Sequence, residues 1–219
     1  MLNQHRVLRV AAAFLLAFSS LAAFVGNARA ALQEGKDYEL VAPAQATETG
    51  NKVEVLEIFW YGCPHCFALE PDLANWVKHL PKNAKFRRMP GVSNASWVPG
   101  AKTFYTFEAM GLTGRLHADM FNAIHVDGLS LDDDRTLFDW VGKHGVNPKQ
   151  FATTYGSFSV QSKVLRAQQL GRAYGISGVP SIIIDGKYRT SPSMTGGSQN
   201  LFPVLDQLIQ KAQQERAHK

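Results

Sequence analysis

The only two cysteines of the chain, Cys63 and Cys66, stand three positions apart in the stretch FWYGCPHCFALEP, with Pro64 and His65 between them. Two thiols at this spacing can form a structural disulfide, bind a metal, or exchange a disulfide with another molecule. A disulfide that closes a four-residue loop adds little stability, because the benefit of a cross-link grows with the length of the loop. The spacing therefore argues against a purely structural role.

Metal binding and haem attachment fit this stretch poorly. A structural zinc site takes four ligands, but the chain has no third cysteine and its seven histidines show no paired ligand spacing. A c-type haem is attached where histidine follows the second cysteine, and Phe67 stands there instead. We therefore expect no metal and no cofactor other than a redox-active Cys63–Cys66 disulfide.

The residues between the cysteines are suited to the start of a helix. Backbone N–H groups without partners at a helix N-terminus carry a partial positive charge, which stabilises a thiolate on Cys63. Pro64 suits the first helical position, and His65 can place a cation or an N–H group beside the same sulfur. A stabilised thiolate favours the reduced form and makes the disulfide a strong oxidant. We therefore expect Cys63 to react with other molecules and Cys66 to be its buried partner.

A strand and a helix are predicted on either side of the motif. Residues 53–60 are apolar at nearly every position, which is typical of a strand covered on both faces. After Gly62 the apolar residues recur at steps of three and four, which predicts a helix. Further strands are expected at 37–40 and 85–89 and as a hairpin at 181–189, followed by a helix at 201–212.

The stretch between the strand at 85–89 and the hairpin is far longer than a simple βαβ connection needs, and its pattern is helical. Asp132 or Asp133 is expected to cap one of its helices, and Asn147 before Pro148 another. Helices are predicted at 101–110, 116–125, 132–144, 148–154 and 160–174.

Residues 1–30 resemble a secretory signal peptide. Arg6 and Arg9 precede a short apolar run, and Ala28 and Ala30 supply the small residues of a cleavage site, so we predict cleavage after Ala30. The apolar run is shorter than the roughly 20 residues of a spanning helix, which disfavours an uncleaved anchor. Without this leader, which holds three of the 23 Lys and Arg, the chain has a formal net charge of +2. Such a charge gives no reason to expect a nucleic-acid partner.

The motifs resemble those of a known group of redox proteins. Cys63-Pro64-His65-Cys66 at a strand-to-helix junction, with Gly178-Val179-Pro180 before the later hairpin, is similar to the thioredoxin superfamily. The Pro-His pair, the leader and the helical insertion make the chain similar to the DsbA family of periplasmic thiol oxidases. The resemblance implies an α/β, thioredoxin-like fold with an inserted all-helical domain. It divides the chain into the leader, a first thioredoxin-like part at 31–94, the insertion at 95–165 and a second part at 166–219.

The resemblance also implies partners and a location. The disulfide would be donated to reduced, newly exported proteins in the periplasm, and a DsbB-like, quinone-linked membrane reoxidase would restore it. We expect a monomer. Neither the range of client proteins nor the identity of the reoxidase follows from the sequence.

Several residues outside the cysteine motif receive roles from the same resemblance. A cis bond before Pro180 would hold the backbone of Val179 open to pair with an extended client segment, with Gly178 and Trp60 as further substrate-binding residues. Glu57 matches the family's buried acid, which acts near the inner cysteine.

The residue pattern gives independent expectations for the acids and one tryptophan. Strand alternation places Glu57 on an apolar face, where a carboxyl without a partner should have a raised pKa. The alternative is a glutamate at the end of the sheet that reaches solvent or a lysine. Glu70 also matches a family acid, but its pattern favours a solvated helix residue. We assign Trp97 to core packing.

Two other functions remain open. A disulfide isomerase or reductase could use the same fold, although the isomerase family adds an N-terminal dimerisation module for which residues 31–62 are too few. Thioredoxin-type reductases favour Gly-Pro between the cysteines and lack the insertion. A non-catalytic client-binding module is the second alternative, but it would have no need of an intact pair of cysteines.

Overall fold

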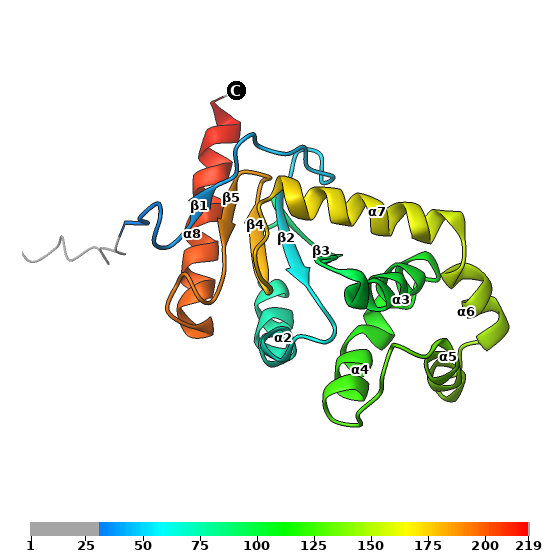
Figure 1. The fold of residues 1–219 in the computed structure, drawn as a ribbon. Coiled ribbons are helices and arrows are strands. Elements are labelled where there is room, and N and C mark those ends of the chain that lie inside the picture. The colour runs from blue at the N-terminus through cyan, green and yellow to red at the C-terminus, as the bar shows by residue number, and fades with distance from the viewer. Residues whose placement is uncertain (1–30, 219) are drawn as a thin grey trace, which may run out of the picture. The chain divides into compact units, whose positions relative to one another are not determined.

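Five strands form one mixed sheet within residues 31–218, the part of the chain that the computed structural model describes (Figure 1). They are β1 (Glu39–Leu40), β2 (Val53–Phe59), β3 (Ala84–Pro90), β4 (Ser181–Ile184) and β5 (Tyr188–Thr190). Their order is β1-β5-β4-β2-β3, and β2 pairs in parallel with β3 and antiparallel with β4. All seven residues of β2 are buried, as its apolar pattern predicts, so the strand that leads to the cysteines is rigidly held.

Two helices, α2 (Pro64–Val77) and α8 (Ser198–Ala217), pack with one side of the sheet. Val53 and Val55 of β2 belong to the same buried cluster as Leu69 of α2 and a row of apolar residues of α8. The α2 helix begins directly after the turn that follows β2, so the sheet and this cluster together determine where the cysteine motif lies.

The insertion forms a helical layer beyond the β3 edge of the sheet, and α7 leads back toward the strands (Figure 1). Its core includes Phe104 and Phe107, which share a buried cluster with Leu56 and Ile58 of β2. Asp133 and Asn147 cap α5 and α6, as predicted. The elements are η1 (Ala95–Trp97), α3 (Val98–Ala109), α4 (Thr113–His125), α5 (Asp134–Lys143), α6 (Pro148–Tyr155) and α7 (Phe158–Ala173).

The predicted limits of some segments differ from those of the elements. Residue 165, the expected end of the insertion, lies inside α7, which continues without a break to Ala173. The proposed leader at 1–30 and its cleavage site lie outside the described residues. None of the helices between residues 31 and 218 combines the length and the apolar character that crossing a membrane requires.

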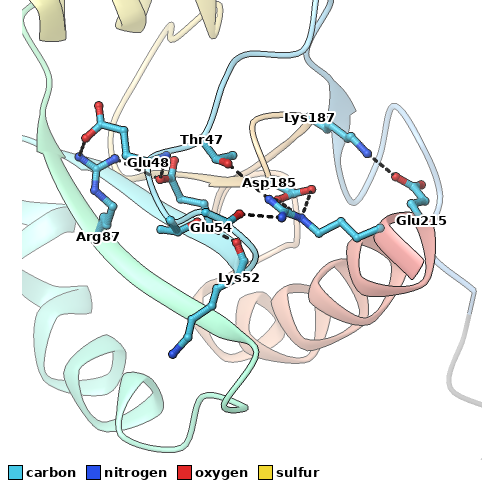
Figure 2. Close-up of polar contacts among 11 residues, drawn as sticks. Thr47, Glu48, Lys52, Glu54, Arg87, Asp185, Lys187 and Glu215 are labelled. Carbon is cyan, nitrogen blue, oxygen red and sulfur yellow. Dashed lines mark hydrogen bonds and ion pairs between the residues drawn. The ribbon is translucent and has the colours of Figure 1, made fainter. Parts of the chain in front are cut away.

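Ion pairs tie the sheet together near the start of β2 (Figure 2). Glu54, a buried acid on this strand, accepts hydrogen bonds from the Glu48 backbone N–H and from the Arg87 guanidinium of β3. Arg216 of α8 binds both carboxylate oxygens of Asp185 in the β4–β5 turn. A buried acid on β2 is therefore tolerated where its charge is matched.

The tight turn between β4 and β5 leads to a prediction about stability. Gly186 has a φ of +68°, and a Cβ atom there would lie 2.1 Å from the Gln45 carbonyl oxygen. We expect Gly186→Ala to lower the free energy of unfolding by more than about 2 kcal/mol, because both the left-handed backbone and the contact resist a side chain. Urea unfolding of the purified protein measures the change.

Gly171→Ala is the matched control. Gly171 lies in α7, and a Cβ atom there would have nothing within 4 Å. This variant should gain about 0.5–1 kcal/mol from the higher helix propensity of alanine. Equal stability of the two variants would contradict the assignment of the turn.

Candidate active site

Cys63 lies at the start of α2, where the chain has turned after β2. It is the N-cap residue, with an extended backbone (φ −89°, ψ 116°), and Pro64 occupies the first turn, as predicted. The first turn holds no acidic residue, and no side-chain hydrogen bond of the described residues caps it. The positive end of the helix is therefore left free to act on the sulfur of Cys63.

The two thiols have opposite electrostatic environments. A hydrogen bond from the Cys66 thiol, the backbone N–H groups of Cys66 and His65, and the charge of His65 lower the pKa of Cys63 to about 6, although burial opposes them. Burial is the main cause of a raised pKa at Cys66, which is fully enclosed, and its hydrogen bond to Cys63 adds to the effect. Both cysteines are free thiols in the structure. Near neutral pH the pair thus holds a thiolate on Cys63 and a proton on Cys66.

The segment before β4 lies against the cysteine motif. The Val179–Pro180 peptide bond is cis, as the resemblance implies, and the Val179 carbonyl oxygen lies 3.4 Å from the Cys63 sulfur. Gly178, Val179 and Pro180 line one side of a groove of about 540 Å³, and His65 lies in the same lining. The predicted substrate-binding backbone is therefore adjacent to the reactive sulfur and open to solvent.

Trp60 lies apart from this groove. Its ring stacks on Trp97 at a centroid distance of 4.5 Å with an interplanar angle of 3°. A Cβ atom at Gly62 would lie 2.4 Å from the Trp60 ring, so the glycine makes room for the indole beside the motif. Trp97 is only half-buried, and the core role that we assigned to it is wrong: it supports Trp60 at the surface.

Glu57 is buried, as predicted, but it has a partner. Its Oε2 atom accepts a hydrogen bond of 2.9 Å from Arg88 Nε, while Oε1 has no partner among the described residues. Burial raises the pKa of Glu57 to about 7, even though the charge of Arg88 lowers it. The carboxylate lies close enough to Cys66 for its charge to contribute to the raised pKa of that thiol.

Glu70 is buried as well, so its interpretation as a solvated helix residue was wrong. Glu70 lies one turn after Cys66 in α2 and contacts Arg88 at 2.7 Å and the His117 ring at 3.5 Å. Burial raises the pKa of Glu70, but hydrogen bonds and charges from His117 and Arg88 outweigh it and leave the pKa below its ordinary value. Arg88 thus bridges two buried carboxylates beneath the cysteines.

Arg88 and His117 were missed because their sequence context is ordinary. Arg88 follows another arginine, Arg87, in a strand that reads as having one polar face, and only the β2–β3 register places it opposite Glu57. His117 lies on a helix of the insertion without a recognisable ligand spacing. The one available signal was the unmatched charge of Glu57, which required a cation from a neighbouring strand.

Comparisons with known proteins agree with this geometry. The chain is 37% identical over 196 residues to the thiol:disulfide interchange protein DsbA of Pseudomonas syringae pv. tomato, covering 90% of this chain and 92% of that protein. It is 39% identical over 178 residues to the protein of the same name from Azotobacter vinelandii, covering 81% and 83% of the two chains. The crystal structure of Pseudomonas aeruginosa DsbA superposes with a TM-score of 0.81 at 34% identity, covering 86% of this chain and 97% of that one.

The family model of the DSBA-like thioredoxin domain matches residues 89–209. This match begins after the cysteines, so it depends on the insertion and the C-terminal part of the fold, while the motif and its geometry provide a separate line of support. The fold is thioredoxin-like with a helical insertion, as predicted. The chain belongs to the DsbA family and is a thiol:disulfide oxidoreductase.

Proposed function

We propose that the protein is a dithiol oxidase of the periplasm, which donates its Cys63–Cys66 disulfide to reduced, newly exported proteins. The observation that carries the proposal is the placement of the two sulfurs. Cys63 is the N-cap of α2, where the Cys66 thiol and the first N–H groups lower its pKa, and Cys66 is fully buried, which raises its pKa. A stabilised thiolate favours the reduced form, so the disulfide gives up its oxidising equivalents readily.

Donation takes two exchanges. A client thiolate attacks the Cys63 sulfur, the Cys63–Cys66 bond breaks, and the electron pair leaves on Cys66. Glu57 is the proposed proton donor to this thiolate. A second client thiolate then attacks the client sulfur of the mixed disulfide, and Cys63 leaves as a thiolate. The client loses two electrons and forms a disulfide. The enzyme is left reduced, with a thiolate on Cys63 and a thiol on Cys66.

The groove beside Cys63 is the proposed client site. Its lining includes the backbone of Gly178 and Val179, and an extended client segment can pair with backbone groups whatever its sequence. Pro180 would keep the Val179 backbone in place, and His65 would face the client from the other side. Trp60, beside Gly62, would contribute an apolar surface outside the groove.

Each turnover leaves the enzyme with two electrons that an external acceptor must remove. A DsbB-like membrane reoxidase linked to quinone is the proposed acceptor, and the redox group is the cysteine pair itself, without a further cofactor. Export through a leader cleaved after Ala30 would bring the protein to the periplasm as a monomer. The isomerase, reductase and client-binding alternatives differ from an oxidase in the redox equilibrium of the cysteine pair or in its importance for activity.

Titration against glutathione buffers tests the direction of the reaction. A strong oxidase stays reduced in a buffer in which a thioredoxin-type reductase is mostly oxidised. We expect the wild-type protein to behave as the oxidase. A reductase-like equilibrium would move that alternative ahead, and client binding that is independent of the redox state would favour the non-catalytic module.

Substitution of each cysteine separates their roles. Cys63→Ser should abolish oxidation of a reduced model protein, because no Cys63–Cys66 disulfide can form for the client thiolate to attack. Cys66→Ala should accumulate mixed disulfides with clients that already carry a disulfide. The Cys63 thiolate attacks that disulfide and one client sulfur leaves as a thiolate, but no Cys66 thiol remains to attack Cys63 and release the client. Non-reducing electrophoresis and a turnover assay measure both outcomes. Normal turnover by the Cys63→Ser protein would end the oxidase proposal.

Glu57→Gln tests the proton donor. The pKa of about 7 means that the carboxyl is protonated below neutrality and loses its proton as the pH rises through that value. Stopped-flow measurements with one client peptide should therefore show the variant slower by about tenfold or more at pH 6, with the ratio falling toward one above pH 7. The ratio cancels the ionisation of the client thiol, which is the same in both reactions.

Glu54→Gln is the matched control, because Glu54 is also a buried acid of β2 but lies near the start of the strand, where its Oε2 atom accepts from the Glu48 N–H and from Arg87 (Figure 2). This variant should keep the wild-type pH profile, whatever stability it loses. A ratio for Glu57→Gln that does not change with pH would rule out proton donation by Glu57.

A further inference from the structure

Two histidines of α4 hold Tyr61, the residue two positions before Cys63. The Tyr61 hydroxyl lies 2.9 Å from His117 Nδ1, and the Tyr61 carbonyl oxygen lies 2.7 Å from His125 Nε2. The histidines are eight residues apart, or about two helical turns, so α4 contacts the side chain and the backbone of the same residue. We call Tyr61, His117 and His125 the tyrosine clamp.

The chemistry of the groups gives each bond a direction. A carbonyl oxygen can only accept, so His125 Nε2 carries a proton and donates to Tyr61. Burial lowers the pKa of His117 and raises that of Tyr61, which leaves the ring neutral and the hydroxyl protonated. The hydroxyl therefore donates to His117 Nδ1. The other ring nitrogen, Nε2, then bears a hydrogen and faces Glu70 at 3.5 Å, with Arg88 as the nearby cation.

Packing leaves Tyr61 little freedom to move. Its side chain is 1% exposed, and its ring contacts Phe59 and Phe121 at centroid distances of 5.1 and 5.0 Å. His125 also stacks on Phe67 at 4.8 Å with an interplanar angle of 9°. Since Phe67 directly follows Cys66, the ring of His125 touches the chain on both sides of the cysteine motif.

We propose that His117 and His125 are positioning residues of the redox centre, which act through Tyr61 to set the affinity of Cys63 for its proton. The groups that lower this affinity are short-range donors, the Cys66 thiol and the first N–H groups of α2. These donors act only if the turn from Trp60 to Cys63 holds the Cys63 sulfur against them. A hydrogen bond from the Cys63 N–H to the Trp60 carbonyl oxygen closes that turn. The clamp connects this turn to the insertion.

This inference rests on the proposed function and adds a role for the insertion, which would help to set the redox equilibrium of the Cys63–Cys66 pair. The Cys63 sulfur has the Val179 carbonyl oxygen as its neighbour, and the groove is lined by other described residues than the two histidines. Their effect should therefore appear in the thiol equilibrium itself and not in client binding.

Three substitutions separate the parts of the clamp. His125→Phe keeps a ring to stack on Phe67 but removes the donor to the Tyr61 carbonyl. His125→Gln restores an N–H donor without the ring. Tyr61→Phe removes only the hydroxyl group that donates a hydrogen bond to His117 Nδ1. Ultraviolet absorbance of the thiolate against pH gives the pKa of Cys63, and titration with glutathione gives the redox equilibrium constant.

His144→Phe is the matched control. His144 follows α5 in the same insertion, is also half-buried, and has its Nδ1 2.8 Å from the Trp140 carbonyl oxygen, with its ring stacked on Trp140. It offers a hydrogen bond and a stack like those of His125 but contacts none of the motif residues. Any general loosening of the insertion should affect both sites alike.

We expect His125→Phe and Tyr61→Phe each to raise the pKa of Cys63 and to shift the redox equilibrium about fivefold toward the disulfide, the factor for one ordinary hydrogen bond. His125→Gln should return both quantities most of the way to their wild-type values, and His144→Phe should leave them unchanged. Wild-type values in both clamp variants, or an equal shift in His144→Phe, would overturn the proposal. Should His125→Phe fail to fold, Tyr61→Phe decides alone, because it deletes a single oxygen.

The wild-type protein separates this proposal from the proposed function. An ordinary thiol pKa in the wild type would contradict the oxidase itself. A low pKa in the wild type that persists in the clamp variants would contradict only the clamp.

Discussion

The negative charge on one sulfur atom, held at the bare N-terminus of α2, is the interaction on which the rest of the site depends. Cys63 is the N-cap residue, and the donors that favour its thiolate are the Cys66 thiol and the N–H groups that a helix start leaves without partners. An acidic residue in the first turn would compete for them, and the sequence has none there. Pro64 begins the helix without an N–H group to satisfy. The buried strand β2 brings the chain to this point and holds it there.

The inner half of the pair needs the opposite environment. Burial keeps the proton on Cys66, so each exchange requires a group that can move it. A buried carboxylate usually destabilises a fold unless a cation matches it, and Glu54 shows the matched case. Glu57 is only partly matched, because Arg88 is shared with Glu70 and one oxygen of Glu57 has no partner in the described structure. Burial raises the pKa of Glu57 to about 7, and this incomplete pairing does not bring it back down.

Local features of the site could be predicted, and features that depend on long-range register could not. The motif, β2 and the start of α2 follow from patterns within a few residues, and the cis bond before Pro180 followed only from the resemblance. Glu70 was misjudged because helical periodicity does not say which neighbour covers a face, and here α4 covers it. Arg88 depends on the β2–β3 register. His125 looks like any helix-terminal histidine until the fold brings it to Tyr61.

Unfolding of the reduced and oxidised proteins, compared as a function of pH, tests the thiolate claim most directly. The folded pKa of Cys63, about 6, lies below its unfolded value of about 8.5. The thiolate therefore stabilises the reduced fold fully above pH 8.5, partly at pH 7, and no longer once the pH falls through 6. The oxidised form has no such group. We predict that the reduced protein is the more stable at pH 7 and that its advantage shrinks as the pH is lowered. A more stable oxidised form at every pH, or a difference that does not change with pH, would contradict the account.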